Sequence, residues 1–220
     1  MCFIFDFNGT CFFDTLINFK AWTRSVHTWF NREFTMDEYQ EYNGRTGRET
    51  IIQLFKDEDL PEDRLAKLTR FQEENYLCVC RESKNLCLAP GLAEFVKTAK
   101  EKGIKVAICT SATADLMKEF RKMLPVDSLF DEENIITTDG TFPSKPDPAI
   151  YRYAMEKLHV KPSECRVFED TRSGIRSAYD AGVKSIVAIT GDNLAQLETN
   201  VPLFMKCADY YPVLSVLKEI

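Results

Sequence analysis

The sequence lacks any long apolar run. No stretch approaches the roughly 18 consecutive apolar residues that a membrane span needs. The opening segment is too short, and already too acidic, to be a signal peptide. We therefore expect a soluble, cytoplasmic protein that does not contact a membrane.

The sequence is also poor in histidine, with only His27 and His159. Its eight cysteines are scattered, and only Cys78 and Cys80 stand close together. A zinc site usually combines two clusters of Cys or His, and no such spacing is present. Free thiols in a reducing compartment are therefore the expected state of the cysteines.

No cluster of basic residues stands out, and 28 basic against 34 acidic residues give a formal net charge of −6. Proteins that bind nucleic acids or membrane surfaces do so through positive charge concentrated on the protein surface. We expect neither as a partner, although a small anion can still be bound locally.

What the chain does contain is typical of a globular protein, with 45% hydrophobic and 28% charged residues. Its 220 residues exceed the roughly 150 of a typical domain. This length indicates one domain with an insertion or two unequal domains.

Short apolar segments alternate with helical patterns along most of the chain. Residues 2–5 form an apolar run that ends abruptly at Asp6, as in a strand buried on both faces. Such alternation predicts parallel βαβ units and an α/β fold. Residues 208–211 are a candidate for a last edge strand before a C-terminal helix that ends at Ile220. The other strands expected are residues 104–109, 134–137, 166–168 and 184–189, and the helices expected between them are residues 91–102, 113–123, 147–158 and 172–181.

Residues 15–85 interrupt this alternation, because helical spacing runs through them with no strand between the helices. We therefore expect an inserted α-helical domain at residues 15–85 and a core domain made of residues 1–14 and 86–220. The helices expected in the insertion are residues 16–30, 48–55 and 61–80.

Polar residues stand where the predicted strands end. In a parallel sheet the carboxyl ends of the strands meet at one edge, where ligands bind. Taken singly, each polar segment has a structural explanation, such as a turn, a helix cap or a solvated loop charge. Their joint occurrence favours a functional site. The set is Asp6, Asn8, Thr110, Ser111, Lys145, Glu169 and Asp170.

In this order the segments resemble the signature of the haloacid dehalogenase-like hydrolase superfamily, which is Asp-x-Asp-Gly-Thr, then Ser or Thr, then Lys, then an acidic pair. The resemblance spans residues 6–170, with the insertion where one cap subclass of the family has it. By pattern the chain is similar to sugar phosphomutases and phosphoglycolate phosphatase-like enzymes. The resemblance implies a Rossmann-like parallel-sheet core with an inserted α-helical cap, and a phosphatase that acts on a small phosphorylated metabolite.

The residue types fit this chemistry. A phosphate monoester is a poor electrophile surrounded by negative charge, so a carboxylate nucleophile such as Asp6 needs a cation beside it. Mg²⁺ prefers oxygen ligands. The expected ligands are Asp6, Asp170 and the backbone carbonyl of Asn8, with Glu169 ligating directly or through water.

The remaining polar residues are expected to meet the phosphoryl group. Lys145 neutralises its oxygens, and Thr110 donates a hydroxyl to the group in transfer. Ser111, next to Thr110, is a further substrate contact.

The first segment departs from the family signature at Asn8. In phosphatases of the family an Asp at this place protonates the leaving oxygen and later deprotonates the attacking water, and an amide can do neither. Loss of general acid–base help typically costs about 10²–10⁴-fold in rate, and less for acidic leaving groups. Three hypotheses follow: a natural enzyme that is slow or uses good leaving groups, an engineered variant that traps a complex, or a protein that binds phosphoryl ligands without catalysis.

Within the insertion, Arg45 stands between two glycines in a loop able to approach a ligand closely. We expect Arg45 to bind a second anionic group of the substrate. The alternative is that Arg45 pairs with Glu41 or Glu49.

The insertion also bears on the alternatives to a phosphatase, which are a phosphomutase and a non-catalytic binding protein. Sugar phosphomutases of similar pattern carry a His about four residues before a cap Trp, and here Asn18 precedes Trp22 instead, which argues against a mutase. Trp22, Trp29 and Phe30 stand at helical spacing, which favours a role in the core of the insertion. No apolar stripe predicts a dimer, so we expect a monomer.

Overall fold

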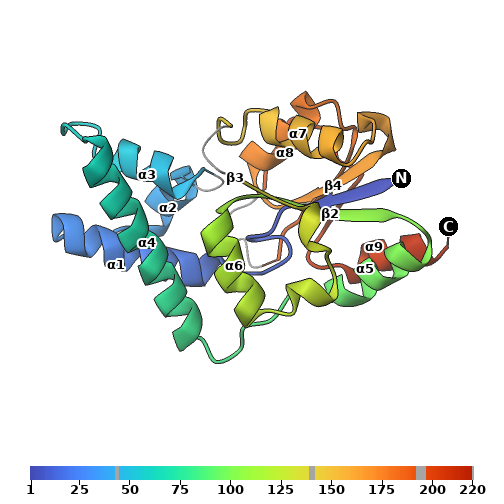
Figure 1. Ribbon diagram of the computed structural model, residues 1–220, viewed down its shortest axis with the longest axis horizontal. Coiled ribbons are helices and arrows are strands. Elements are labelled where there is room, and N and C mark those ends of the chain that lie inside the picture. Colours follow the sequence, from blue (N-terminus) through green and yellow to red (C-terminus); the bar gives the residue numbers. More distant parts are fainter. Residues whose placement is uncertain (43–44, 139–141, 192–196, 220) are drawn as a thin grey trace. The chain divides into compact units, whose positions relative to one another are not determined.

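The computed structural model describes residues 1–42, 45–138, 142–191 and 197–219. It divides into two compact units (Figure 1). The sheet unit consists of Met1–Phe13 and Cys87–Ile220, and the helical unit of Asp14–Leu86.

The sheet unit is built on one six-stranded sheet in the order β3-β2-β1-β4-β5-β6. Each strand pairs with its neighbours in parallel. This is the strand order of the Rossmann fold, in which the chain reverses its direction of winding between the first and fourth strands. The predicted α/β, Rossmann-like class is confirmed. The strands are β1 (Cys2–Phe5), β2 (Lys105–Thr113), β3 (Ile135–Thr138), β4 (Cys165–Glu169), β5 (Ser185–Ile189) and β6 (Met205–Cys207).

Helices cover both faces of this sheet. Figure 1 shows α7 and α8 on one face and α5 and α9 on the other. Among the short 3₁₀ turns, η2 (Glu132–Asn134) leads into β3 and η3 (Pro162–Glu164) leads into β4, while η1 (Val126–Ser128) follows α6. The helices of the unit are α5 (Leu92–Glu101), α6 (Ala114–Met123), α7 (Ala149–Lys157), α8 (Arg172–Asp180) and α9 (Tyr211–Lys218).

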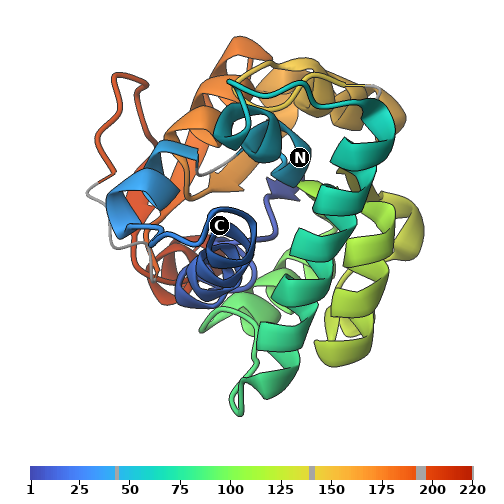
Figure 2. The same cartoon turned by 90° about the vertical axis from the view of Figure 1, so that its left-hand side faces the viewer.

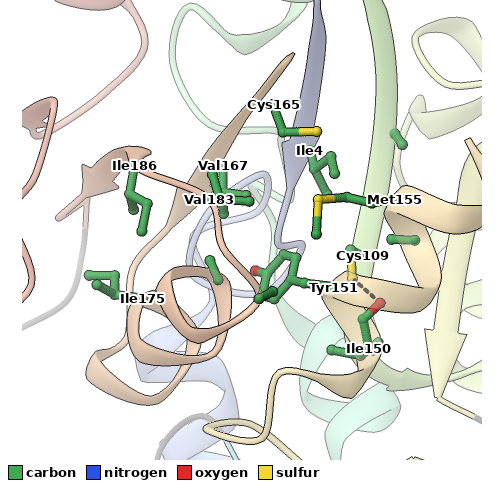
Figure 3. Packing of buried hydrophobic residues seen from close by; sticks show 14 of the residues in the cluster. Ile4, Cys109, Ile150, Tyr151, Met155, Cys165, Val167, Ile175, Val183 and Ile186 are labelled. Atoms are coloured by element: carbon green, nitrogen blue, oxygen red, sulfur yellow. Dashed lines mark hydrogen bonds between the residues drawn. The ribbon is translucent and has the colours of Figure 1, made fainter. Parts of the chain in front are cut away.

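The apolar run of β1 is buried on both faces, as predicted. Because side chains alternate along a strand, Ile4 faces a cluster that includes Tyr151 and Met155 of α7 (Figure 3). Phe3 and Phe5 face the other side, where both rings contact Phe95 of α5. The central strand is therefore fixed between two hydrophobic layers, and the residues that follow it are held in place.

Two elements of the sheet unit differ from the sequence prediction by more than two residues. The edge strand expected at residues 208–211 is wrong, since β6 ends at Cys207 and α9 begins at Tyr211. The Asp209 carboxylate accepts a hydrogen bond from the Tyr211 N–H (3.0 Å), and a proline in the first turn favours a helix start there. The expected helix end at Ile220 lies outside the described residues.

The second strand is also longer than predicted. β2 continues to Thr113, with an irregular register to β3 after Cys109. Thr113 then caps α6, because its hydroxyl accepts a hydrogen bond from the Leu116 N–H (3.2 Å). Thr110 and Ser111 consequently lie within the last part of β2 rather than beyond it.

The helical unit contains α1 (Thr15–Phe30), α2 (Met36–Tyr42), α3 (Gly47–Leu54) and α4 (Glu62–Glu82). Figure 2 looks nearly along α1 and shows α4 over its whole length. The unit has its own hydrophobic core, in which Trp22 is buried while Trp29 and Phe30 pack against it. These aromatic residues serve the core, as the helical spacing indicated. The buried members of the core are Trp22, Val26, Phe34, Tyr39, Ile51, Phe55 and Leu65.

Helix α2 was not predicted from the sequence. The Thr35 hydroxyl accepts from the Glu38 N–H (3.2 Å), and the Glu38 carboxylate accepts from the Thr35 N–H (3.1 Å). This reciprocal capping box is a local signal that starts a helix. The Thr-x-x-Glu pattern was therefore readable in the sequence.

Among the described residues, none of the helices combines the length and the apolar character of a membrane span. All eight cysteines are free thiols, as expected, and only Cys78 and Cys87 are exposed. Burial raises the pKa of both Cys80 and Cys109 to about 12.

We predict that the folded protein reacts through only two of its eight cysteines, Cys78 and Cys87. A thiol reacts as its thiolate, so burial limits access to the other six, and the raised pKa protects Cys80 and Cys109 further. Ellman's reagent near pH 8 should titrate these two rapidly and all eight after denaturation. Rapid labelling of Cys80 or Cys109 in the folded protein, located by mass spectrometry, would contradict the packing described above.

Candidate functional site

Four of the polar residues predicted from the sequence lie together at the carboxyl ends of β1 and β4: Asp6, Lys145, Glu169 and Asp170. These strands are direct neighbours, with Phe5 opposite Phe168. Asp6 follows β1, and its N–H donates to the Phe168 carbonyl (2.9 Å). Because the chain reverses its winding between β1 and β4, the two strand ends flank the crevice where Rossmann-like folds bind ligands.

The loop after β1 brings Asp170 against the segment that carries Asp6. The Thr10 hydroxyl donates to the Asp170 carboxylate (3.0 Å). Gly9 has a positive φ of 76°, and a Cβ built there would lie 2.1 Å from Asp170 Oδ2. Only glycine combines this backbone conformation with so close an approach. The Asn-Gly-Thr turn therefore holds Asp170 beside the first strand.

Lys145 joins the two strand ends and is only 2% exposed. Its ammonium donates to Asp6 Oδ1 (2.6 Å), to Glu169 Oε1 (2.6 Å) and to the Cys109 carbonyl of β2 (3.4 Å). Burial alone would lower the pKa of Lys145, but the carboxylates of Asp6 and Glu169 outweigh it and raise the pKa above its ordinary value. The side chain therefore stays positively charged in the folded protein.

Glu169 is fully buried, and both of its carboxylate oxygens accept hydrogen bonds. Oε1 accepts from Lys145 (2.6 Å) and from the Tyr151 hydroxyl (2.9 Å). Oε2 accepts from the Asp170 N–H (3.0 Å) and from the N–H and hydroxyl of Thr171 (both 3.2 Å). A Cβ at Gly174 would lie 1.8 Å from Glu169 Oε1, so the first turn of α8 leaves space for this carboxylate.

Asp6, Glu169 and Asp170 together could hold a metal ion. Each offers a carboxylate oxygen, and these oxygens all lie within 4.8 Å of one another. The Lys145 ammonium pairs with two of them, Asp6 and Glu169, and Asp170 accepts from the Thr10 hydroxyl. An all-oxygen, negatively charged donor set fits a hard divalent cation such as Mg²⁺.

The other predicted residues of the sheet unit lie in the same region of the fold. Asn8 is half-buried in the turn after β1 and forms an isolated bridge with Phe12. Thr110 is buried and follows Cys109, whose carbonyl accepts from Lys145, while its hydroxyl accepts from the Ala112 N–H (3.1 Å). Ser111 is half-buried in β2.

Arg45 belongs to the helical unit, where it is exposed just before α3. Within the part of the chain that the structure describes, no carboxylate forms an ion pair with Arg45. The Glu49 carboxylate instead accepts from the N–H (3.3 Å) and the hydroxyl (3.0 Å) of Thr46. The loop glycine at position 44 lies outside the described residues.

Sequence reasoning missed three participants in this site: Thr10, Tyr151 and Thr171. A tyrosine on the buried face of a helix signals a hydroxyl that needs a partner, so Tyr151 was detectable as polar. The acceptor of its hydrogen bond could not be predicted, because Glu169 lies on another element.

A family model described as haloacid dehalogenase-like hydrolase matches residues 3–188. The chain belongs to this family. The predicted family, and with it the hydrolase class of enzyme, is thereby confirmed.

Relatives of this haloacid dehalogenase-like hydrolase match over nearly its whole length. A phosphorylated carbohydrates phosphatase of Thermotoga maritima is 29% identical over 220 residues, covering 99% of this chain and 98% of the relative. A pyrophosphatase, PpaX, of Bacillus cereus is 24% identical over 215 residues, covering 96% and 95%. The crystal structure of a family IA, variant 3 HAD hydrolase from Entamoeba histolytica matches with a TM-score of 0.83 and 28% identity, covering 100% and 99%.

We predict that Gly174→Ala destabilises this haloacid dehalogenase-like hydrolase by about 1–3 kcal/mol, because a methyl group there overlaps the Glu169 carboxylate. The measurement is denaturant unfolding. The control is Gly47→Ala, another glycine in a first helical turn, where a Cβ meets nothing closer than 3.4 Å. Equal stability of the two variants would show that the α8 turn can move away from Glu169.

We further predict that Lys145→Met lowers the free energy of unfolding by about 3–5 kcal/mol, because it leaves buried carboxylates without their cation. Because the pKa of Lys145 is raised in the folded state, its contribution to the free energy of unfolding is fully present below the pKa of a lysine in the unfolded chain, about 10.4. The loss should therefore be constant from about pH 6 to about pH 9.

The control for Lys145→Met is Lys218→Met, which removes an exposed pair with Glu94 (2.6 Å) and should cost about 0–1 kcal/mol. Denaturant unfolding at each pH gives both values. A loss for Lys145→Met no larger than that for Lys218→Met would contradict the assigned role of the buried ammonium.

Proposed function

We propose that this protein is a Mg²⁺-dependent phosphohydrolase that acts on a small phosphorylated metabolite through an aspartyl phosphate at Asp6. The observation that carries the proposal is the buried ammonium of Lys145, held 2.6 Å from Asp6 at the end of the central strand. A carboxylate beside a fixed cation is suited to attack an anionic phosphoryl group. The phosphatase names of the relatives support the same reaction class.

In the proposed first step, a carboxylate oxygen of Asp6 forms a bond to phosphorus while the bond from phosphorus to the leaving oxygen breaks. Lys145 offsets the negative charge that gathers on Asp6 and on the phosphoryl oxygens. Because the ammonium is buried, its interaction with these groups is stronger than it would be in water. In the second step, water attacks the phosphorus of the aspartyl phosphate and restores the Asp6 carboxylate.

Asp6, Asp170 and the backbone carbonyl of Asn8 would hold the Mg²⁺ ion, which supplies positive charge to the phosphoryl oxygens when bound. The five hydrogen bonds that Glu169 accepts favour an indirect role for this carboxylate, through Lys145 or a metal-bound water. The close approach of its oxygens to those of Asp6 and Asp170 supports its place at the rim of the metal site.

We assign substrate contacts to Thr110, Ser111 and Arg45. Thr110 would donate its hydroxyl to the phosphoryl group, with Ser111 beside it. Arg45 would meet a second anionic group, which is supported by its exposure and by the absence of a carboxylate partner within the described residues. The helical unit would then act as a cap that selects the substrate and excludes water.

Asn8 favours substrates with acidic leaving groups. An amide cannot protonate a leaving alkoxide, whereas an acyl phosphate or pyrophosphate loses a group that needs no proton. A relative named as a pyrophosphatase supports such an anhydride substrate. The eight free thiols support a reducing compartment such as the cytoplasm as the place of action.

We predict that phosphate is released in the presence of Mg²⁺ from acetyl phosphate and pyrophosphate, more rapidly than from sugar phosphate monoesters. Asn8→Asp should raise monoester hydrolysis by about 10²–10⁴-fold and acyl phosphate hydrolysis by less. Asp6→Ala should abolish release from every substrate. Phosphate release is measured colorimetrically, and rapid quenching with mass spectrometry detects phosphorylated Asp6.

Activity that survives in Asp6→Ala would overturn the assignment of the nucleophile. The second candidate function, a protein that binds phosphorylated ligands without turnover, rests on Asn8 alone. Turnover by Asn8→Asp only, together with ligand binding by the parent chain, would favour that second function.

A further inference from the structure

Tyr151 lies beneath the site and has no role in the reaction proposed above. It is fully buried in α7 and belongs to the apolar cluster that contains Ile4 and Met155 (Figure 3). Its ring centroid is 5.0 Å from the Lys145 ammonium, and its hydroxyl donates to Glu169 Oε1 (2.9 Å). One side chain thus touches two of the charged groups of the site.

A buried hydroxyl costs free energy unless it is hydrogen-bonded, so an apolar residue would serve packing alone at lower cost. Here the partner is a carboxylate, which makes the hydrogen bond charge-assisted and geometrically specific. Burial, followed by the proximity of Glu169, raises the pKa of Tyr151 well above its ordinary value. The hydroxyl therefore remains a donor.

We propose that Tyr151 is a positioning residue whose hydroxyl fixes the Glu169 carboxylate and thereby keeps the Lys145 ammonium directed at Asp6. The kinetic part of this inference rests on the proposed phosphohydrolase function.

Two donors share Glu169 Oε1. This oxygen accepts from Tyr151 and from Lys145, while Lys145 also donates to Asp6 at the same distance, 2.6 Å. Donation by Tyr151 offsets part of the negative charge on Oε1 and so weakens its attraction for the ammonium. Without that donor, Lys145 is the remaining donor to Oε1, and the ammonium moves toward Glu169 at the expense of Asp6.

Tyr151→Phe tests this inference, because it removes the hydroxyl and keeps the ring. The matched control is Tyr210→Phe, another fully buried tyrosine of the same unit, whose hydroxyl has no hydrogen-bond partner among the described residues. Removing a partner outside the directly reacting groups typically costs about 10–100-fold in activity. We expect a loss of this size in kcat for Tyr151→Phe, a change in KM of less than about twofold, and parent-like values for Tyr210→Phe.

A merely structural role for Tyr151 would not depend on Glu169. In a Glu169→Ala background, Tyr151→Phe should therefore change kcat by less than about twofold, since no carboxylate remains for the hydroxyl to hold. Thermal unfolding of every variant confirms that the kinetic values refer to folded protein. Equal losses in both backgrounds would overturn the inference, as would parent-like kcat in Tyr151→Phe.

A measurement without turnover separates this inference from the proposed function. Orthovanadate with Mg²⁺ is titrated calorimetrically into the parent chain and into Tyr151→Phe. Since vanadate adopts the geometry of a phosphoryl group in transfer, its affinity should fall by about the factor seen in kcat. If no substrate turns over, the phosphohydrolase proposal fails, and the vanadate affinities alone decide: weaker binding by Tyr151→Phe upholds the positioning role, and equal binding overturns it.

Discussion

The buried ammonium of Lys145, shared between Asp6 and Glu169, is the interaction on which the rest of the site depends. Moving charges out of water costs several kcal/mol per ion, and the cost is offset only when geometry and hydrogen bonds are nearly complete. Here the ammonium donates to three acceptors on different strands and loops, and Glu169 accepts from five donors. These partners come from the end of β1, from β2, β4 and α7, and from the start of α8, so the cluster forms only when these elements are assembled.

The Rossmann strand order makes this assembly possible. β1 and β4 are adjacent although more than half of the chain lies between them, and their ends place Asp6 beside Glu169 and Asp170. Two glycines then permit close approach, Gly9 to Asp170 and Gly174 to Glu169. The apolar run of β1 and the glycines at these two places thus serve one requirement, which is to hold the three carboxylates close together.

Asn8 separates two parts of catalysis that usually occur together in this family. In the proposed reaction, Lys145 and the carboxylates that the structure brings together supply the electrostatic part. The proton-transfer part lacks the carboxyl group that the family signature has at this place. Under the proposed function, such a site is suited to substrates whose leaving group needs no proton. The helical unit has a hydrophobic core of its own.

Much of this protein was readable from its sequence. The apolar run before Asp6, the alternation of strands and helices, and the polar residues at strand ends were sufficient to predict the fold class. They also singled out Asp6, Lys145, Glu169 and Asp170, which the structure brings together. These are local properties, because hydrophobic periodicity and turn chemistry act over a few residues. The same locality explains the errors at residues 208–211, where Asp209 and the proline of α9 outweighed the apolar character of the segment. Only the tertiary structure decided that Lys145 bridges Asp6 and Glu169, that Thr10 holds Asp170, and that Tyr151 donates to Glu169. Those pairings depend on strand order, register and helix placement, which bring together groups up to 160 residues apart and leave no periodic signal in the chain.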